Sequence, residues 1–170
     1  MHHWLIALIG AVVGVGLFLW WYGQRPYRYK NIQRNKLARF LETLLHRGYQ
    51  GGLLILETKR SGPERKFLQF SKYIGQDGRA GLEFGFPLAV WSRPYYDVLR
   101  KELEAEGIRF QLHDTGRQDT LQFLVVDIGP DVALAQRVAD LAVHTVFGST
   151  HSSFQAFYQN VSPRAERIGR

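Results

Sequence analysis

The first 24 residues, MHHWLIALIGAVVGVGLFLWWYGQ, carry no charged side chain. Their apolar part, from Trp4 to Tyr22, is 19 residues long. A helix of that length measures roughly 28 Å, which is close to the thickness of the hydrocarbon core of a bilayer. We therefore expect a single-pass transmembrane anchor over residues 1–24, and the rest of the chain has room for one small domain.

A cleaved signal peptide is the competing interpretation of this segment. Such a leader has a basic start, a shorter apolar run and small residues at the cleavage site. Here the chain starts with MHH, and the apolar run ends in Trp20, Trp21 and Tyr22. Aromatic residues of this kind are typical of the headgroup level of a membrane, and Trp4 would mark the opposite interface. The sequence thus predicts a retained anchor.

Small residues recur along the expected helix at intervals of three and four. Gly10 and Gly14 have the GxxxG spacing, and Ala7 and Ala11 extend the same strip. Residues at these intervals share a helix face and let a second helix approach closely. We expect this strip to contact a partner helix; the alternative is simple tolerance of glycine, which is common in membrane helices.

A basic cluster follows the apolar segment and carries most of the formal net charge of +7. It contains no acidic residue and six basic ones: Arg25, Arg28, Lys30, Arg34, Lys36 and Arg39. A positive segment directly after the first helix tends to stay in the cytoplasm, so we expect the N-terminus outside and the following domain inside. The cluster also suits anionic lipid headgroups; the alternative is that it only sets the topology.

The rest of the chain is nearly neutral, because residues 40–163 hold 13 basic and 14 acidic side chains. Nucleic-acid-binding domains carry a basic surface, so this balance argues against a nucleic-acid partner. Arginine outnumbers lysine 16 to 6, which favours a bacterium and therefore its plasma (inner) membrane. The chain has no cysteine, which excludes disulfides and cysteine-ligated metal sites.

Hydrophobic periodicity predicts a small, two-layer α+β domain with a mainly antiparallel sheet and two to three helices. We expect residues 25–48 to form a basic juxtamembrane segment with an amphipathic helix over 31–46. The apolar side of that helix either caps the domain, which we favour, or lies on the membrane. Residues 49–148 form the expected soluble domain, and residues 149–170 a polar, partly disordered tail.

Local signals place the elements inside this domain. Short apolar or alternating runs predict strands at 53–57, 65–74, 82–86, 109–113 and 121–126. Ser92 and Pro94 predict the start of a helix that Gly107 ends. A last helix is expected over 132–147, ended by Gly148. The predicted order is helix, three strands, helix, two strands, helix.

No residue pattern indicates catalysis. His2 and His3 are the only adjacent histidines, while His144 and His151 are separated by Gly148, which should end the helix between them. The serines lack a glycine-flanked nucleophile elbow, and no phosphate-binding loop of the P-loop type occurs. We therefore expect no enzymatic activity, no metal and no cofactor.

These features together favour a non-catalytic accessory or assembly subunit of a larger membrane protein complex. Its expected partners are other integral membrane subunits and anionic lipid headgroups. A membrane-tethered immunity or inhibitor protein that captures one soluble partner is the alternative, and an enzyme with a dispersed site is a third class.

Overall fold

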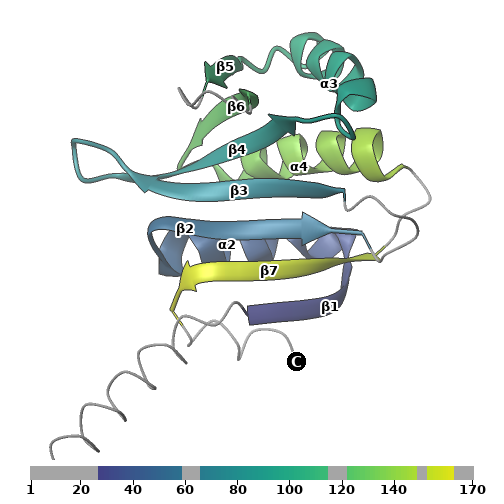
Figure 1. Ribbon diagram of the computed structural model, residues 1–170. Helices are drawn as coiled ribbons and strands as arrows, with labels where there is room; N and C mark the ends of the chain where they lie inside the picture. Colours follow the sequence, from purple (N-terminus) through teal and green to yellow (C-terminus); the bar gives the residue numbers. More distant parts are fainter. Residues whose placement is uncertain (1–26, 59–65, 115–121, 149–152, 163–170) are drawn as a thin grey trace, which may run out of the picture.

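The computed structural model of the protein describes residues 27–58, 66–114, 122–148 and 153–162. These residues form a seven-stranded antiparallel sheet with three α-helices packed on it (Figure 1). Across the sheet the strand order is β1-β7-β2-β3-β4-β6-β5. The prediction of an α+β domain with a mainly antiparallel sheet is therefore confirmed.

The elements alternate between strands and helices along the chain. The strands are β1 (Tyr27–Gln33), β2 (Gly48–Glu57), β3 (Phe67–Ile74), β4 (Ala80–Leu88), β5 (Gln111–Asp114), β6 (Gln122–Gly129) and β7 (Ser153–Val161). The helices are the 3-10 turn η1 (Arg34–Lys36) and the α-helices α2 (Leu37–Arg47), α3 (Arg93–Ala105) and α4 (Val132–Phe147).

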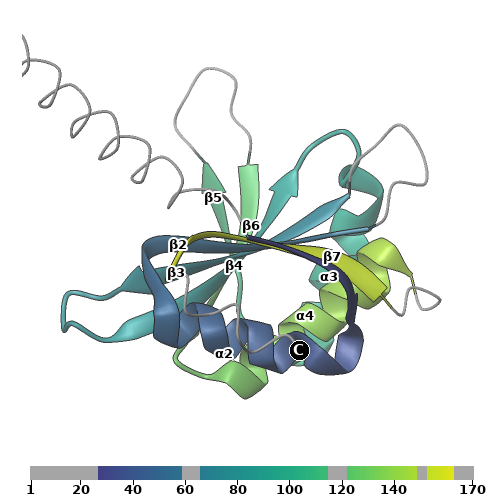
Figure 2. The same ribbon diagram turned by 90° about the horizontal axis from the view of Figure 1, so that it is seen from below.

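One hydrophobic core lies between the sheet and the helices. Helices α2 and α4 lie next to each other on one face of the sheet, and α3 packs against α4 (Figure 2). Alternate strand residues point into this core, and the fully buried ones include Leu54, Leu56, Phe70, Phe84 and Val126. Ala135, Ala139 and Ala142 of α4 are also fully buried, and such small side chains allow close packing of the helix.

Helix α2 caps the domain, as the favoured interpretation predicted, because its Leu37, Leu41 and Leu44 are fully buried. The predicted start of this helix at residue 31 is wrong. Residues 27–33 form strand β1 instead, which pairs with β7, and the helix begins only after the 3-10 turn η1. A partner strand more than 100 residues away decides this structure, so local periodicity could not reveal it.

The prediction that residues 149–170 form a polar, partly disordered tail is wrong for residues 153–161. They form β7, which lies between β1 and β2 and pairs with both. Phe154 and Ala156 are fully buried and Tyr158 is 2% exposed, so alternate residues of this strand point into the core. Because β1 and β7 belong to the sheet, the described domain extends beyond the predicted limits of 49 and 148 at both ends.

The described helix ends mostly follow the predicted signals. Gly107 and Gly148 have positive φ angles of 68° and 87°, which favour glycine directly after a helix. Ser92 differs from the prediction, because its side chain does not cap α3. Its hydroxyl accepts a hydrogen bond from the Ala89 amide at 2.7 Å and donates to the Pro87 carbonyl, which shapes the turn before the helix.

Within the described ranges, no helix is both long and apolar enough to cross a membrane. The predicted anchor over residues 1–24 lies outside those ranges.

Candidate functional site

The sheet face opposite the helices is not covered by any helix or strand of the described ranges (Figures 1 and 2). We call it the open face. Its side chains come from the strand positions that alternate with the core positions, and they include Leu53, Ile55, Glu57, Phe67, Gln69, Ser71, Tyr73, Glu83, Pro87, Gln111, His113, Phe123, Val125, Asp127, Gln155, Phe157 and Gln159. Most of them are half-buried by their neighbours on the sheet.

The centre of the open face carries no charge. The strand register places one residue of each of six strands in a single row, namely Phe157, Ile55, Gln69, Gly85, Val125 and Gln111. Six neighbouring strands span roughly 24 Å. Gly85 adds no side chain to the middle of this row, so all six positions of the row are uncharged.

Two carboxylates lie directly opposite each other beside this row. Glu83 of β4 and Asp127 of β6 are paired in the strand register. Like charges in this position repel each other. Polar hydrogens near the pair offset part of the repulsion: the Ser71 hydroxyl donates to Glu83 at 3.4 Å, and the Gly129 amide donates to Asp127 at 3.1 Å.

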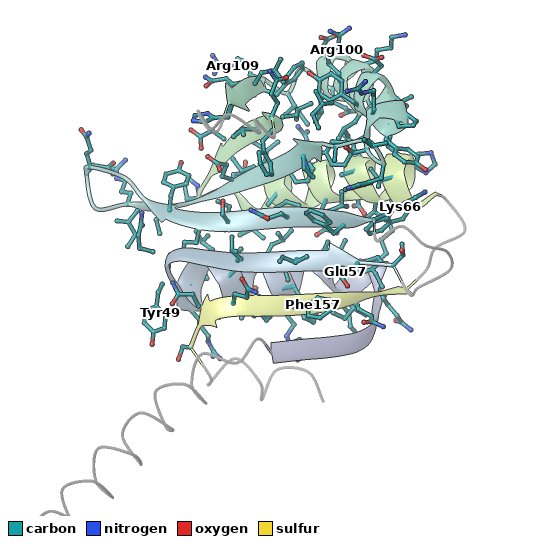
Figure 3. All side chains as sticks on the ribbon, in the orientation of Figure 1. Tyr49, Glu57, Lys66, Arg100, Arg109 and Phe157 are labelled. Carbon is teal, nitrogen blue, oxygen red and sulfur yellow. The ribbon has the colours of Figure 1, made fainter. Side chains whose placement is uncertain are left out.

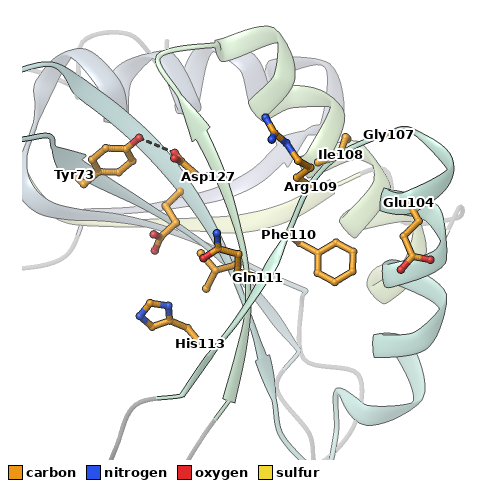
Figure 4. Close-up of a pocket in the computed structure, with 11 residues that line it drawn as sticks. Tyr73, Glu104, Gly107, Ile108, Arg109, Phe110, Gln111, His113 and Asp127 are labelled. Atoms are coloured by element: carbon orange, nitrogen blue, oxygen red, sulfur yellow. Dashed lines mark hydrogen bonds between the residues drawn. The ribbon is translucent and has the colours of Figure 1, made fainter.

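Tyr73 connects β3 to β6 across the strand between them. Its ring lies over Gly81, its register partner on β4, where a Cβ atom would overlap the ring. Its hydroxyl donates a 2.6 Å hydrogen bond to Asp127 (Figure 4). This hydrogen bond is the largest cause that raises the pKa of Tyr73 to about 12, and burial and the nearby carboxylates add to it. At neutral pH the phenol is therefore a hydrogen-bond donor and not a base.

A hollow of about 900 Å³ lies between these groups and the connection from α3 to β5 (Figure 4). Strand β5 pairs with β6 only from Gln111 onwards, so residues 107–110 run free of β6 and leave this space. Its lining combines Tyr73, Glu83 and Asp127 with Glu104, Gly107, Ile108, Arg109, Phe110, Gln111, His113 and Val125.

Charged and polar side chains line much of the hollow. It contains three carboxylates, of Glu83, Glu104 and Asp127, and one guanidinium, of Arg109. Among the described residues, no three His, Asp or Glu side chains are arranged so that they could hold a metal ion. The arrangement can accept a polar or cationic group through hydrogen bonds and charge attraction.

The sequence-predicted site residues are only partly described. The helix-packing strip, the aromatic interface residues and Arg25 lie outside the described ranges. Arg28 and Lys30 belong to β1, while Lys36 and Arg39 are exposed.

Arg34 of the basic cluster is bound to helix α4. Its Nε lies 2.6 Å from the Asp140 carboxylate, and its Nη2 donates to the Asp140 carbonyl at 3.0 Å. This guanidinium therefore joins η1 to α4. Its predicted role in topology or lipid attraction stays a prediction.

Sequence reasoning missed the open face and its hollow. One signal was present, because Phe67 to Tyr73 is rich in apolar and aromatic residues at both odd and even positions. Such a strand has apolar groups on both faces of the sheet, whereas helices cover only one of them here. The cross-strand meeting of Glu83 and Asp127 could not be found, since it depends on the pairing of distant strands.

No model of a known protein family, no curated protein and no solved structure matches this chain.

Proposed function

We propose that this protein is a non-catalytic accessory or assembly subunit of a larger complex in the inner membrane of a bacterium. Residues 4–22 anchor it as a single pass, with the N-terminus outside and the α+β domain in the cytoplasm. The open face of the sheet is its surface for binding a protein subunit of the complex.

The uncharged centre of the open face carries this proposal. Protein interfaces are depleted of charge at their centre and polar at their rim. Ile55, Gln69 and Val125 occupy the centre, and the carboxylates of Glu83 and Asp127 lie beside it. A partner that places a basic group near these two carboxylates would relieve their repulsion. The same charge attraction would fix the orientation of the partner on the sheet.

The anchor supplies a second contact with the same complex. The strip of Ala7, Gly10, Ala11 and Gly14 offers a close approach to a partner helix within the membrane. Two contacts on one chain raise the effective concentration of each, so each can be weak while the assembly is stable. The basic cluster supports this arrangement through anionic lipid.

Purification from the native membrane in mild detergent tests the proposal. The protein should be recovered with at least one integral membrane subunit, and Ile55→Arg should reduce that recovery because it places a charge at the centre of the open face. Val98→Arg is the matched control, since Val98 is 48% exposed on α3 and away from the open face. Both variants should first be shown to keep the unfolding midpoint of the parent within a few degrees.

Two results would contradict the proposal. If the protein migrates alone, it is not a subunit of a stable membrane complex. If it captures a single soluble partner, the immunity or inhibitor class is favoured. Reporters fused to the C-terminus test the orientation, and a periplasmic signal would contradict the predicted topology.

A further inference from the structure

Two exposed apolar side chains lie at the end of the sheet where the described chain begins. Tyr27 pairs with Tyr158, and Tyr158 pairs with Leu54. Since Tyr49 precedes Leu54 by five residues on β2, it lies beyond the level of Tyr27 at this same end (Figure 3). Tyr49 is 58% exposed and Ile74, the last residue of β3, is 47% exposed. We call this the Tyr27 end of the sheet.

Hydrogen bonds of Gln50 hold the two apolar residues in place. The Ile74 amide donates to the Gln50 side-chain oxygen, which ties the end of β3 to the start of β2. The Asn160 side chain donates to the Gln50 carbonyl at 2.9 Å, which ties in the end of β7. Three strands are thus joined around Gln50, and Tyr49 and Ile74 are presented from an ordered backbone.

The chemistry of this end fits the headgroup level of a bilayer. Tyrosine has an apolar ring and a polar hydroxyl, and it is enriched where a membrane meets water. The turn after Ile74 carries Arg79, whose side chain is 87% exposed and lies 3.5 Å from the Asp77 carboxylate. The end therefore combines an aromatic ring, an aliphatic side chain and an exposed arginine that is paired with Asp77.

The length of the chain before Tyr27 brings this end close to the proposed membrane. Five residue steps separate Tyr22, the last aromatic residue of the predicted span, from Tyr27. Fully extended, they reach at most about 17 Å. A span that ends at Tyr22 therefore keeps the Tyr27 end within that distance of the interface, while the other end of the sheet lies a strand length farther away.

We propose that the Tyr27 end rests on the lipid bilayer, with Tyr49 and Ile74 inserted at the headgroup level. This inference rests on the anchor in the proposed function and adds an orientation of the domain. With this end against the membrane, the strands run away from the bilayer, and the open face stands upright beside it, where it can contact the cytoplasmic part of a membrane subunit.

Single-cysteine labelling tests the orientation, since the chain contains no cysteine of its own. The full chain is reconstituted into vesicles of phosphatidylcholine and phosphatidylglycerol, and spin labels are placed in Tyr49→Cys and Ile74→Cys. Val90→Cys is the control, because Val90 is 86% exposed after the far end of β4. Accessibility of each label to oxygen, which dissolves in lipid, and to a water-soluble nickel complex is measured.

The labels at residues 49 and 74 should lose most of their collisions with the nickel complex relative to Val90→Cys and gain collisions with oxygen. Equal nickel accessibility at all three positions would overturn the inference. Alkaline extraction of the same vesicles separates this result from the anchor. A chain that resists extraction while its labels remain in water would contradict the orientation alone, whereas a chain that is released would contradict the anchor.

Discussion

The Tyr73 hydroxyl of β3 donates a 2.6 Å hydrogen bond to Asp127 of β6, across the intervening strand β4. This contact is possible because the strand between them has Gly81 under the tyrosine ring. Asp127 in turn lies opposite Glu83. The three side chains form one polar group at the edge of the uncharged centre of the open face, and their energetics can be tested separately.

Tyr73→Phe should make the domain less sensitive to alkaline pH. The folded-state pKa of Tyr73 is raised to about 12 from an ordinary value of 10.0. Between these values the folded protein retains a proton that the unfolded chain loses, so this contribution to stability is complete below pH 10 and is lost as the pH rises to 12.

Urea unfolding of the full chain in detergent, followed by circular dichroism from pH 9 to pH 12, measures this loss. The parent protein should lose more stability over the range than Tyr73→Phe. The buried Tyr158, whose pKa is also raised, is present in both proteins and cancels in the comparison. Parallel pH curves would contradict the role of the hydrogen bond.

Glu83→Gln should stabilise the domain by roughly 0.2–1 kcal/mol at neutral pH and low salt, since it removes a like charge opposite Asp127. The gain should shrink as salt is added, because salt screens the repulsion in the parent protein. Glu57→Gln is a suitable control, as Glu57 pairs with Phe67 and Gln155 and faces no carboxylate in the register. A loss of stability in Glu83→Gln alone would contradict the repulsion.

Tyr158 should be the residue that holds both unpredicted strands to the helix layer. Its ring stacks on Phe40 of α2 with centroids 5.8 Å apart and meets Tyr29 of β1 edge-on at 5.8 Å. Its buried hydroxyl donates to the Phe40 carbonyl at 2.7 Å. Tyr158→Phe should lower the free energy of unfolding by about 0.5–1.5 kcal/mol, because it removes this hydrogen bond.

Tyr158→Ala should cost more, about 3–5 kcal/mol, since a large aromatic side chain leaves the core. Hydrogen exchange gives a sharper measurement than the unfolding midpoint. Amides of β1 and β7 should lose protection in Tyr158→Ala, while those of β4 and β6 keep most of theirs. Uniform loss over the whole sheet would show that β1 and β7 are not held separately by this cluster.

Elements with local signals were predictable, and elements that depend on distant partners were not. The last helix was expected at 132–147 and is observed there, because Asp131 caps it at 2.9 Å and Gly148 follows it. The hairpin of β5 and β6 was likewise expected from its alternating residues. Strands β1 and β7 pair with each other across the length of the chain, so neither is stable or recognisable alone.

The candidate site was beyond local reasoning for the same reason. Tyr73 and Glu83 belong to predicted strands, and Asp127 lies one residue beyond the predicted end of its strand at residue 126. Their contact depends on the order β3-β4-β6, although α3 and β5 lie between β4 and β6 in the sequence. In the sequence, the only sign of the site is that β3 has apolar residues on both faces. These residues form part of a binding surface only because of the order of the strands in the sheet.

Thr145→Val should leave the stability unchanged or raise it by up to about 1 kcal/mol. The Thr145 hydroxyl oxygen is buried and has no hydrogen-bond partner among the described residues. A methyl group of similar shape removes an unpaired polar atom from the interior. Thermal unfolding measures the effect, and a clear decrease in the midpoint would indicate a partner for this hydroxyl.

Site-specific photo-cross-linking in native membranes tests the binding role of the open face most directly. A photoreactive benzoylphenylalanine at Gln69, in the central row, should give one discrete adduct with a protein that resists alkaline extraction of the membrane. The same group at Lys101, exposed on α3, should give none. Absence of an adduct at Gln69, or the same adduct from both positions, would contradict the open face as the surface that binds the partner subunit.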